Sequence, residues 1–222
     1  MARITWDETG QRFFELGVKK GVLYPYNSGS SSYSTGVPWN GLTNITQSPE
    51  GAEPTDMYAD DIKYASLRSA ENFGCTIECY TYPDEFAACN GEVDLTEGVT
   101  IGQQDRAMFG LSYVTTIGND VDPDVGYKIH LVYGCTASPS EASYASINDS
   151  PEASTFSYEV DTSPVNVTGH KPVAHLVIDS RKVSAEGLTA IEDKLYGDSS
   201  AGTPSLPLPD EVLSIITTAD EG

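Results

Sequence analysis

The sequence predicts a mostly β domain, with antiparallel strands arranged as a sandwich or open barrel and a minor helical part. Two observations carry this prediction. Several runs alternate apolar and polar residues with a period of two, which is the pattern of a strand with one buried face. Clusters of Gly, Asn, Asp and Pro separate these runs, as turns separate strands. The 222 residues suit one domain, so we treat residues 1–222 as a single unit.

The clearest element is a long antiparallel hairpin over residues 106–136. Apolar residues alternate from 107 to 117 and again from 125 to 135, and the turn-forming segment 118–124 lies between them. Further strands are expected at 62–68, 73–81, 155–161 and 172–179. We expect one face of the hairpin to be solvated, because the remaining parity holds small or polar residues: Gly110, Ser112, Thr116, Gly126, Lys128 and His130.

Other segments fall outside the strand pattern. Residues 83–91 and 184–196 predict a short helix and a flanking helix, since each has capping signals at both ends. Residues 198–222 predict an extended C-terminal arm with about one helical turn, because three prolines interrupt its start. Residues 26–60 predict a long loop rich in Ser, Gly and Thr, and its large apolar side chains indicate that it docks on another surface.

The charge balance excludes one class of function. Thirty-three acidic and 12 basic side chains give a net charge of −21. A protein that binds the nucleic-acid backbone tightly needs clustered Lys and Arg instead. The charge is uneven, because residues 1–25 sum to +1 (4 − 3) and residues 184–222 sum to −7 (1 − 8). We therefore expect DNA to be contacted, if at all, without tight binding.

We expect the protein to be made and kept in a cytoplasm. No apolar run has the length of a membrane span, and residues 1–10 lack the apolar core of a secretory signal. Cys75, Cys79, Cys89 and Cys135 are then expected to be reduced and buried.

Catalytic and metal-binding motifs are missing from the sequence. It has no G-x-S-x-G, G-x-G-x-x-G, P-loop or H-E-x-x-H pattern. Asp120, Asp122 and Asp124 match the start of a calcium loop, but Gly126 and Leu131 do not fit the rest of that loop. We therefore predict no enzymatic activity, no metal and no cofactor, and we interpret the three histidines as ordinary surface or half-buried residues.

Specific strings in the chain resemble one protein family. They are GVKKGVLYP at 17–25, GVPWNGL at 36–42, QSPEGAEPT at 47–55, YADDIKY at 58–64, SAENFG at 69–74, IE at 77–78, YTYPDEF at 80–86, EDKLYG at 192–197 and LPLPDEV at 206–212. Together they resemble the major tail proteins, or tail-tube proteins, of long-tailed non-contractile phages of Gram-positive bacteria. The resemblance extends over about the whole chain.

The resemblance implies a structural virion protein that is assembled in the host cytoplasm and resides in the phage tail. Such subunits form hexameric rings that stack into a tube, which conducts DNA during ejection. The implied partners are further copies of the chain, a tape-measure protein in the lumen, and tail terminator and distal tail proteins at the ends. DNA would pass without specific binding, and no membrane is involved. The chain shows no added immunoglobulin-like decoration domain, so surface adhesion by such a domain is not implied.

Two sets of residues are candidates for the surfaces of such a tube. Glu71, Glu78, Lys128 and His130 are candidates for the lumen wall, where acidic groups would repel phosphate. Contacts between rings are expected to join the basic N-terminal segment to the long 26–60 loop, and the candidates are Arg12, Lys19, Lys20, Trp39, Glu50, Glu53 and Tyr58.

One alternative from a different class stays open. A secreted or surface β-sandwich adhesin, or a carbohydrate-binding module, would use Trp39 and the tyrosines of the 26–60 loop as an aromatic platform.

Overall fold

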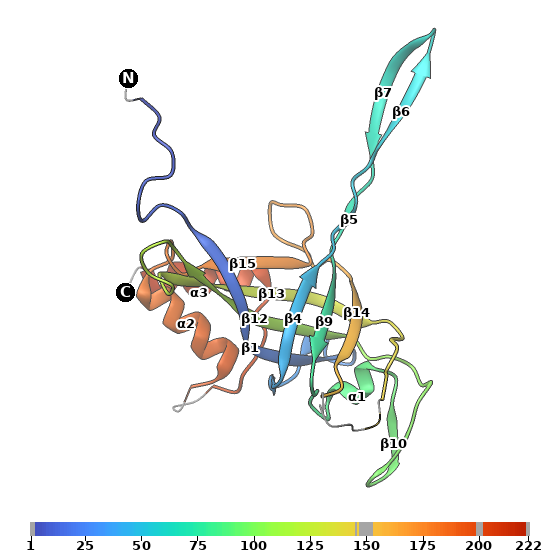
Figure 1. The fold of residues 1–222 in the computed structure, drawn as a ribbon. Helices are drawn as coiled ribbons and strands as arrows, with labels where there is room; N and C mark the ends of the chain where they lie inside the picture. The colour runs from blue at the N-terminus through green and yellow to red at the C-terminus, as the bar shows by residue number, and fades with distance from the viewer. Residues whose placement is uncertain (1–2, 145, 147–152, 199–201, 221–222) are drawn as a thin grey trace.

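The computed structural model describes residues 3–144, 146, 153–198 and 202–220. It confirms the mostly β prediction, because its main body is a nine-stranded antiparallel sheet (Figure 1). The strand order is β2-β1-β12-β13-β14-β9-β4, with β15 also paired to β13 and β3 also paired to β1. The strands of this sheet are β1 (Phe14–Asn27), β2 (Ser32–Tyr33), β3 (Val37–Trp39), β4 (Leu42–Gln47), β9 (Gly74–Cys79), β12 (Phe109–Gly118), β13 (Gly126–Ala137), β14 (Phe156–Thr162) and β15 (His175–Asp179).

The predicted hairpin over 106–136 forms the centre of the sheet as β12 and β13. Its turn is held by Asn119, whose side chain accepts hydrogen bonds from the backbone N–H groups of Val121 and Asp122 at 2.9 and 2.7 Å. Near its other end the register shifts by one residue, and Gly134 adopts a φ of +61° there. A side chain at Gly134 would collide with the backbone of Ser163, so glycine is required at this bulge.

The prediction of one solvated hairpin face is wrong. Ser112 pairs with Leu131, and Tyr113 pairs with His130, so the even-numbered residues of β12, which include Ser112, and those of β13, which include His130, lie on opposite faces. Ser112 is fully buried and lies in contact with Tyr24, and Gly110 packs against Leu206. Alternation identifies the two faces of each strand, but only the cross-strand register decides which faces coincide.

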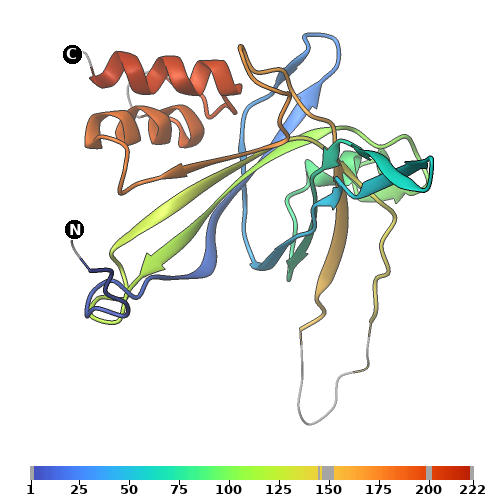
Figure 2. The ribbon, with the colours of Figure 1, turned by 90° about the horizontal axis from the view of Figure 1, so that it is seen from above.

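Two helices cover one face of the sheet, as Figure 2 shows. They are α2 (Ala185–Tyr196) and α3 (Pro209–Asp220). α2 follows its prediction closely: the Ser184 hydroxyl accepts a hydrogen bond from the Gly187 N–H at 3.0 Å, and the helix ends at Gly197, which has a φ of +84°.

The prediction of an extended arm at 198–222 is wrong for its second half, where α3 forms. Pro209 suits the first helical position, and Asp210 and Glu211 favour the helix N-terminus. Val212 is buried in the core beneath the helices, and Ile215 and Ile216 pack against that core. Pro204 and Pro207 therefore precede the helix, and Pro209 begins it.

The prediction of a 26–60 loop is also wrong, because most of this stretch forms short strands. β2, β3 and β4 belong to the main sheet, followed by β5 (Glu50–Gly51) and β6 (Pro54–Ala59). Trp39 is buried: its ring lies 4.6 Å from that of Phe86, and its Nε1 donates to the Thr81 carbonyl oxygen at 3.0 Å. Phe86 begins the short helix α1 (Phe86–Cys89), which was predicted within 83–91.

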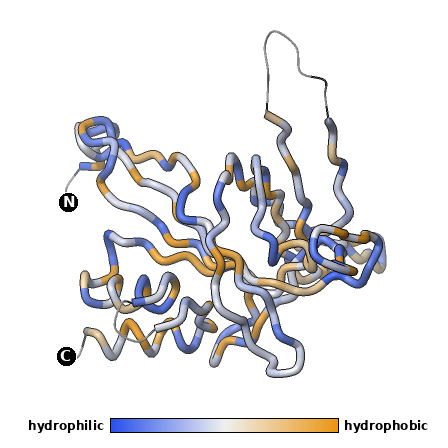
Figure 3. Tube along the Cα trace, turned by 90° about the horizontal axis from the view of Figure 1, so that it is seen from below, coloured by the Kyte–Doolittle hydropathy of each residue, from blue (hydrophilic) through white to orange (hydrophobic). Residues whose placement is uncertain are grey.

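Two hairpins project from the body at opposite ends in Figure 1. One consists of β6 and β7 (Ile62–Arg68) on a stalk of β5 and β8 (Glu71–Asn72); we call residues 50–72 the arm. The other consists of β10 (Val93–Thr96) and β11 (Val99–Ile101). Figure 3 shows that hydrophobic residues are densest where the sheet strands converge in the middle of the molecule. Among the residues described, no helix is long and apolar enough to cross a membrane.

Candidate functional site

Four strands form a unit whose two outer edges are open. β1, β12, β13 and β15 pair in that order, each antiparallel to the next. Residues 14–20 of β1 pair only with β12, and β15 pairs only with β13, within the described part of the chain. Because the unit has an even number of alternating strands, its two edge strands run in opposite directions. An antiparallel sheet can therefore continue from one copy to the next.

The edge of β15 is ready to accept another strand. Backbone bonds from Tyr133 to Ala174 and from Ser180 to Tyr127 show that the even-numbered residues of β15 face β13. The N–H and C=O groups of the odd-numbered residues, including Val177, therefore point outward. The Val177 side chain is 43% exposed. An edge of this kind is a template for strand pairing unless something covers it.

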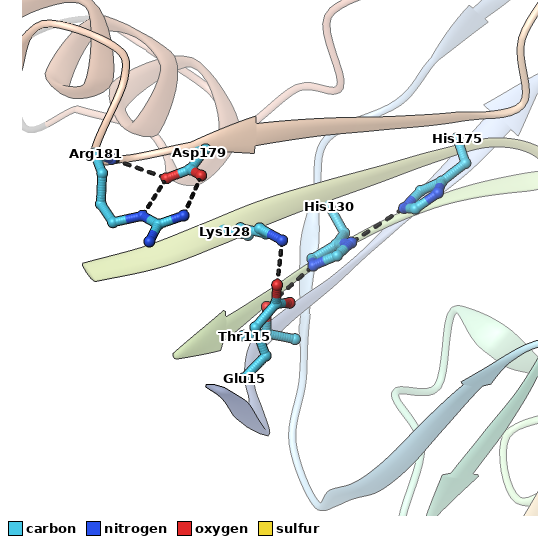
Figure 4. A network of polar contacts seen from close by, with 7 residues as sticks. All are labelled: Glu15, Thr115, Lys128, His130, His175, Asp179 and Arg181. Carbon is cyan, nitrogen blue, oxygen red and sulfur yellow. Dashed lines mark hydrogen bonds and ion pairs between the residues drawn. The ribbon is translucent and has the colours of Figure 1, made fainter. Parts of the chain in front are cut away.

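The face of the four-stranded unit opposite α2 and α3 is polar (Figure 4). Lys128 forms an ion pair with Glu15, and Arg181 forms one with Asp179 at 2.7 Å. Hydrogen bonds from Arg181 lower the pKa of Asp179 to about 2. The Arg181 guanidinium also lies 5.0 Å from the ring centre of Phe13. We call this surface the polar face. Each of its two cations, Lys128 and Arg181, is paired with a carboxylate.

A column of stacked rings lies beneath the polar face. The rings of Tyr113 and His130 are parallel at 4.5 Å, His175 follows at 5.3 Å, and Phe73 stacks on His175 at 4.5 Å. His130 Nδ1 and His175 Nε2 are hydrogen-bonded at 3.1 Å, and His130 Nε2 is 3.1 Å from the Thr115 hydroxyl. Burial lowers the pKa of each histidine to about 4.

A groove of about 540 Å³ lies on another part of the surface, where β1 bulges next to β4 and the end of α2. Its lining includes Val18, Lys19, Lys20, Trp39, Leu42 and Tyr196. Lys20 has a φ of +53°, which is unusual for a residue other than glycine. Its ammonium lies 5.3 Å from the Tyr196 ring centre and 3.8 Å from Glu192.

The structure does not bring the four lumen candidates together. Lys128 lies on the polar face, but Glu71 is on the stalk of the arm and Glu78 is half-buried on β9. The prediction of a solvent-facing His130 is wrong, because its side chain is 6% exposed within the ring column. The two acidic candidates, Glu71 and Glu78, therefore lie outside the polar face.

The inter-ring candidates fall into three groups. Lys19 and Lys20 line the groove, while Glu50, Glu53 and Tyr58 are exposed on the arm. Arg12 is engaged within its own chain, by Asp120 at 3.6 Å and by the Asp7 carbonyl oxygen.

The prediction of Trp39 as an inter-ring contact needs correction. Only 3% of its surface is exposed, so it belongs to the core although it also lines the groove. Sequence reasoning missed His175, Val177 and Tyr196, whose roles arise from pairing between distant strands and helices. The apolar run Leu176–Ile178 indicated a strand here, but nothing in the sequence indicated that this strand lies at an edge.

Metal and thiol chemistry receive no support from the described residues. Among them no cluster of His, Cys, Asp or Glu has the geometry to hold a metal ion. The four cysteines are free and buried, and desolvation raises the pKa of Cys75 and Cys89 to about 12. Thiols in such an environment are inert packing groups.

Comparison of the chain with protein-family models and with curated proteins found no match.

Proposed function

We propose that this protein is a structural subunit of a phage tail tube, in which six copies form a ring and rings stack into a conduit for DNA. The observation that carries the proposal is the four-stranded unit with two open edges of opposite direction. The β1 edge of one copy pairs with the β15 edge of the next, which removes both edges at once. The sequence resemblance supplies the number of copies.

The dimensions of such a ring suit a channel. Six copies contribute 6 × 4 = 24 strands, and strands about 4.8 Å apart with a tilt of about 40° close into a barrel about 48 Å across. Barrels with fewer strands than this already leave an aqueous channel. A double helix can therefore pass through the ring without displacing the wall.

The polar face is the wall of this channel, because α2 and α3 cover the other face. A conduit must not retain its cargo. Lys128 and Arg181 are each held by a carboxylate, so neither cation is free to bind phosphate. Neutralised cations, rather than an excess of acids, keep this wall from binding DNA.

The alternative of an adhesin or carbohydrate-binding module rested on Trp39 and on the tyrosines of the 26–60 loop. Trp39 is buried and cannot belong to an aromatic platform, whereas Tyr58 is exposed on the arm.

Electron microscopy of concentrated purified protein tests the proposal, with sixfold rings or tubes as the expected result. Val177→Pro provides the decisive comparison. Proline removes an N–H that points out of the sheet, so the bonds between β15 and β13 remain while pairing with a neighbouring β1 is lost. We expect this variant to stay folded and monomeric.

Val177→Thr is the matched control, because it changes the side chain and keeps the N–H. It should form rings as the wild type does. If the wild type stays monomeric at all concentrations, or Val177→Pro forms normal rings, the proposed edge pairing is wrong.

A further inference from the structure

The hairpin of the arm has one apolar face that no described part of the chain covers. The register pairs Met57 with Ala65, Ala59 with Ile62 and Thr55 with Leu67, so these residues share one side. Met57, Ile62 and Leu67 are 47%, 64% and 60% exposed. The other side holds Asp56, whose carboxylate pairs with Lys63 at 2.7 Å. A two-stranded hairpin this amphipathic is only marginally stable in water until its apolar side is buried.

The arm is also acidic, most of all at its tip. Residues 50–72 contain six acids and two bases. The tip is a two-residue turn of Asp60 and Asp61, both with positive φ, at 50° and 61°. Turns of this type favour Asn-Gly, so two aspartates here add strain and mutual repulsion. Neither forms an ion pair with any described residue. The arm therefore presents apolar groups and unpaired carboxylates at its far end.

The groove beside β1 has the complementary chemistry. Its walls supply apolar surface from Val18, Leu42 and Tyr196, and Lys19 and Lys20 are the only charged residues among the described residues that line it. Register shifts on both sides of Lys19 interrupt the pairing of β1 with β12 and present the two lysines at the surface. Lys19 has no ion-pair partner in the described structure, whereas Lys20 forms an ion pair with Glu192.

The two features lie at opposite ends of the molecule. In Figure 1 the arm extends beyond the upper edge of the sheet. The groove is lined by the first residue of β4 and the last residue of α2, and both of these ends lie on the lower side of the molecule. A protrusion at one end and its complement at the other make a contact that repeats from copy to copy. The other projecting hairpin is a poor receptor for the arm, because its own charged residues Asp94 and Glu97 are acidic.

We propose that the arm of one copy docks in the groove of a copy in the adjacent ring. Met57 and Ile62 bury their side chains against the groove, and the Asp60–Asp61 turn pairs with Lys19 and Lys20. This assignment rests on the proposed tube, for which it names the contact that holds successive rings together.

A charge exchange between arm and groove tests the contact. Lys19→Glu and Asp61→Lys should each reduce the amount of stacked rings about tenfold or more, since each places like charges together. The two reversals combined in one chain should restore stacking. Glu97→Lys is the matched control, because it reverses an exposed acid in the turn of the β10–β11 hairpin and should leave stacking unchanged.

Disulfide formation between two single variants separates this contact from ring closure. Asp61→Cys and Asn40→Cys place one thiol at the arm tip and one at the groove, while the native thiols are buried. The two proteins should cross-link when mixed at high concentration, and Glu97→Cys mixed with Asn40→Cys should not.

Each outcome has a distinct meaning. If wild-type tubes form but the mixture does not cross-link and the charge variants stack normally, the docking is wrong and the tube proposal stands. If the cross-link forms but sixfold rings do not, the docking holds and the ring proposal fails. If neither forms, both are wrong.

Discussion

His130 and His175 share a hydrogen bond inside the protein, with 3.1 Å between the two ring nitrogens. One imidazole must donate and the other must accept, so the accepting ring is neutral. Burial lowers the pKa of each histidine to about 4, so both rings are neutral near pH 7. Stacking between Tyr113 and Phe73 holds the rings parallel. The groups that face the pair include the Glu15 carboxylate and the Lys128 ammonium, which act on His130 in opposite directions. Burial therefore decides the pKa of both histidines.

The histidine pair predicts a loss of stability on acidification. Each folded-state pKa is lowered to about 4, below the unfolded value of about 6.5, so the unfolded chain binds more protons between these values. The stability is complete above about pH 6.5 and declines as the pH falls toward about 4. Urea titrations should show a loss of roughly 2 kcal/mol for each histidine between about pH 7.5 and pH 5.

His175→Phe removes one titrating group and can still stack on Phe73. Its loss of stability over the same pH interval should be smaller than that of the wild type. His170→Gln is the control, since His170 is exposed and lies outside the column. Equal pH dependence in His175→Phe and the wild type would contradict this interpretation.

At the scale of elements, the sequence predicted those helices and strands whose ends are marked by neighbouring residues. Capping by Ser184 and termination at Gly197 define α2 without reference to the rest of the chain. For α3 the prolines before Pro209 masked an amphipathic pattern that becomes decisive only when Val212 packs on the sheet. The prediction of a 26–60 loop failed for a similar reason at β4 and β5, because these strands are stabilised by β9 and β8, which come later in the chain.

The arm predicts a difference in hydrogen exchange between the free and assembled protein. β6 and β7 pair only with each other, so their amides should exchange rapidly in the monomer. In the assembled tube the same amides should be protected, because the apolar side is buried and the hairpin is stabilised. Mass spectrometry of peptides from residues 54–68 measures this change.

Peptides from β12 and β13 provide the internal reference, since both strands are central and mostly buried. They should exchange slowly in both states. Protection of the arm in the monomer, or its continued rapid exchange in the tube, would contradict burial of the arm on assembly.

At the scale of the whole molecule, the net charge opposes assembly. A ring of six copies carries 6 × (−21) = −126 charges, and stacking repeats this charge along the tube. On the polar face, cations and carboxylates pair one to one, whereas the arm carries an excess of acids. Docking of the arm against lysines offsets part of the repulsion where rings meet.

Ring formation should therefore respond to ionic strength. Raising the salt concentration from about 0.01 M to 0.15 M shortens the screening length from about 30 Å to about 8 Å, which weakens repulsion between subunits. Sedimentation velocity should show rings at lower protein concentration after this change. Weaker ring formation on adding salt in this range would indicate that attraction between charges, rather than strand pairing, closes the ring.

The sequence by itself determined the strand-rich class, the central hairpin and α2, because alternation and capping are properties of neighbouring residues. Only the tertiary structure decided that the even-numbered residues of β12 and β13 face opposite ways, that Trp39 is buried, and that β1 and β15 form open edges. Register, bulges and edge position depend on contacts between residues far apart in the chain. The surfaces available for assembly are set by those contacts.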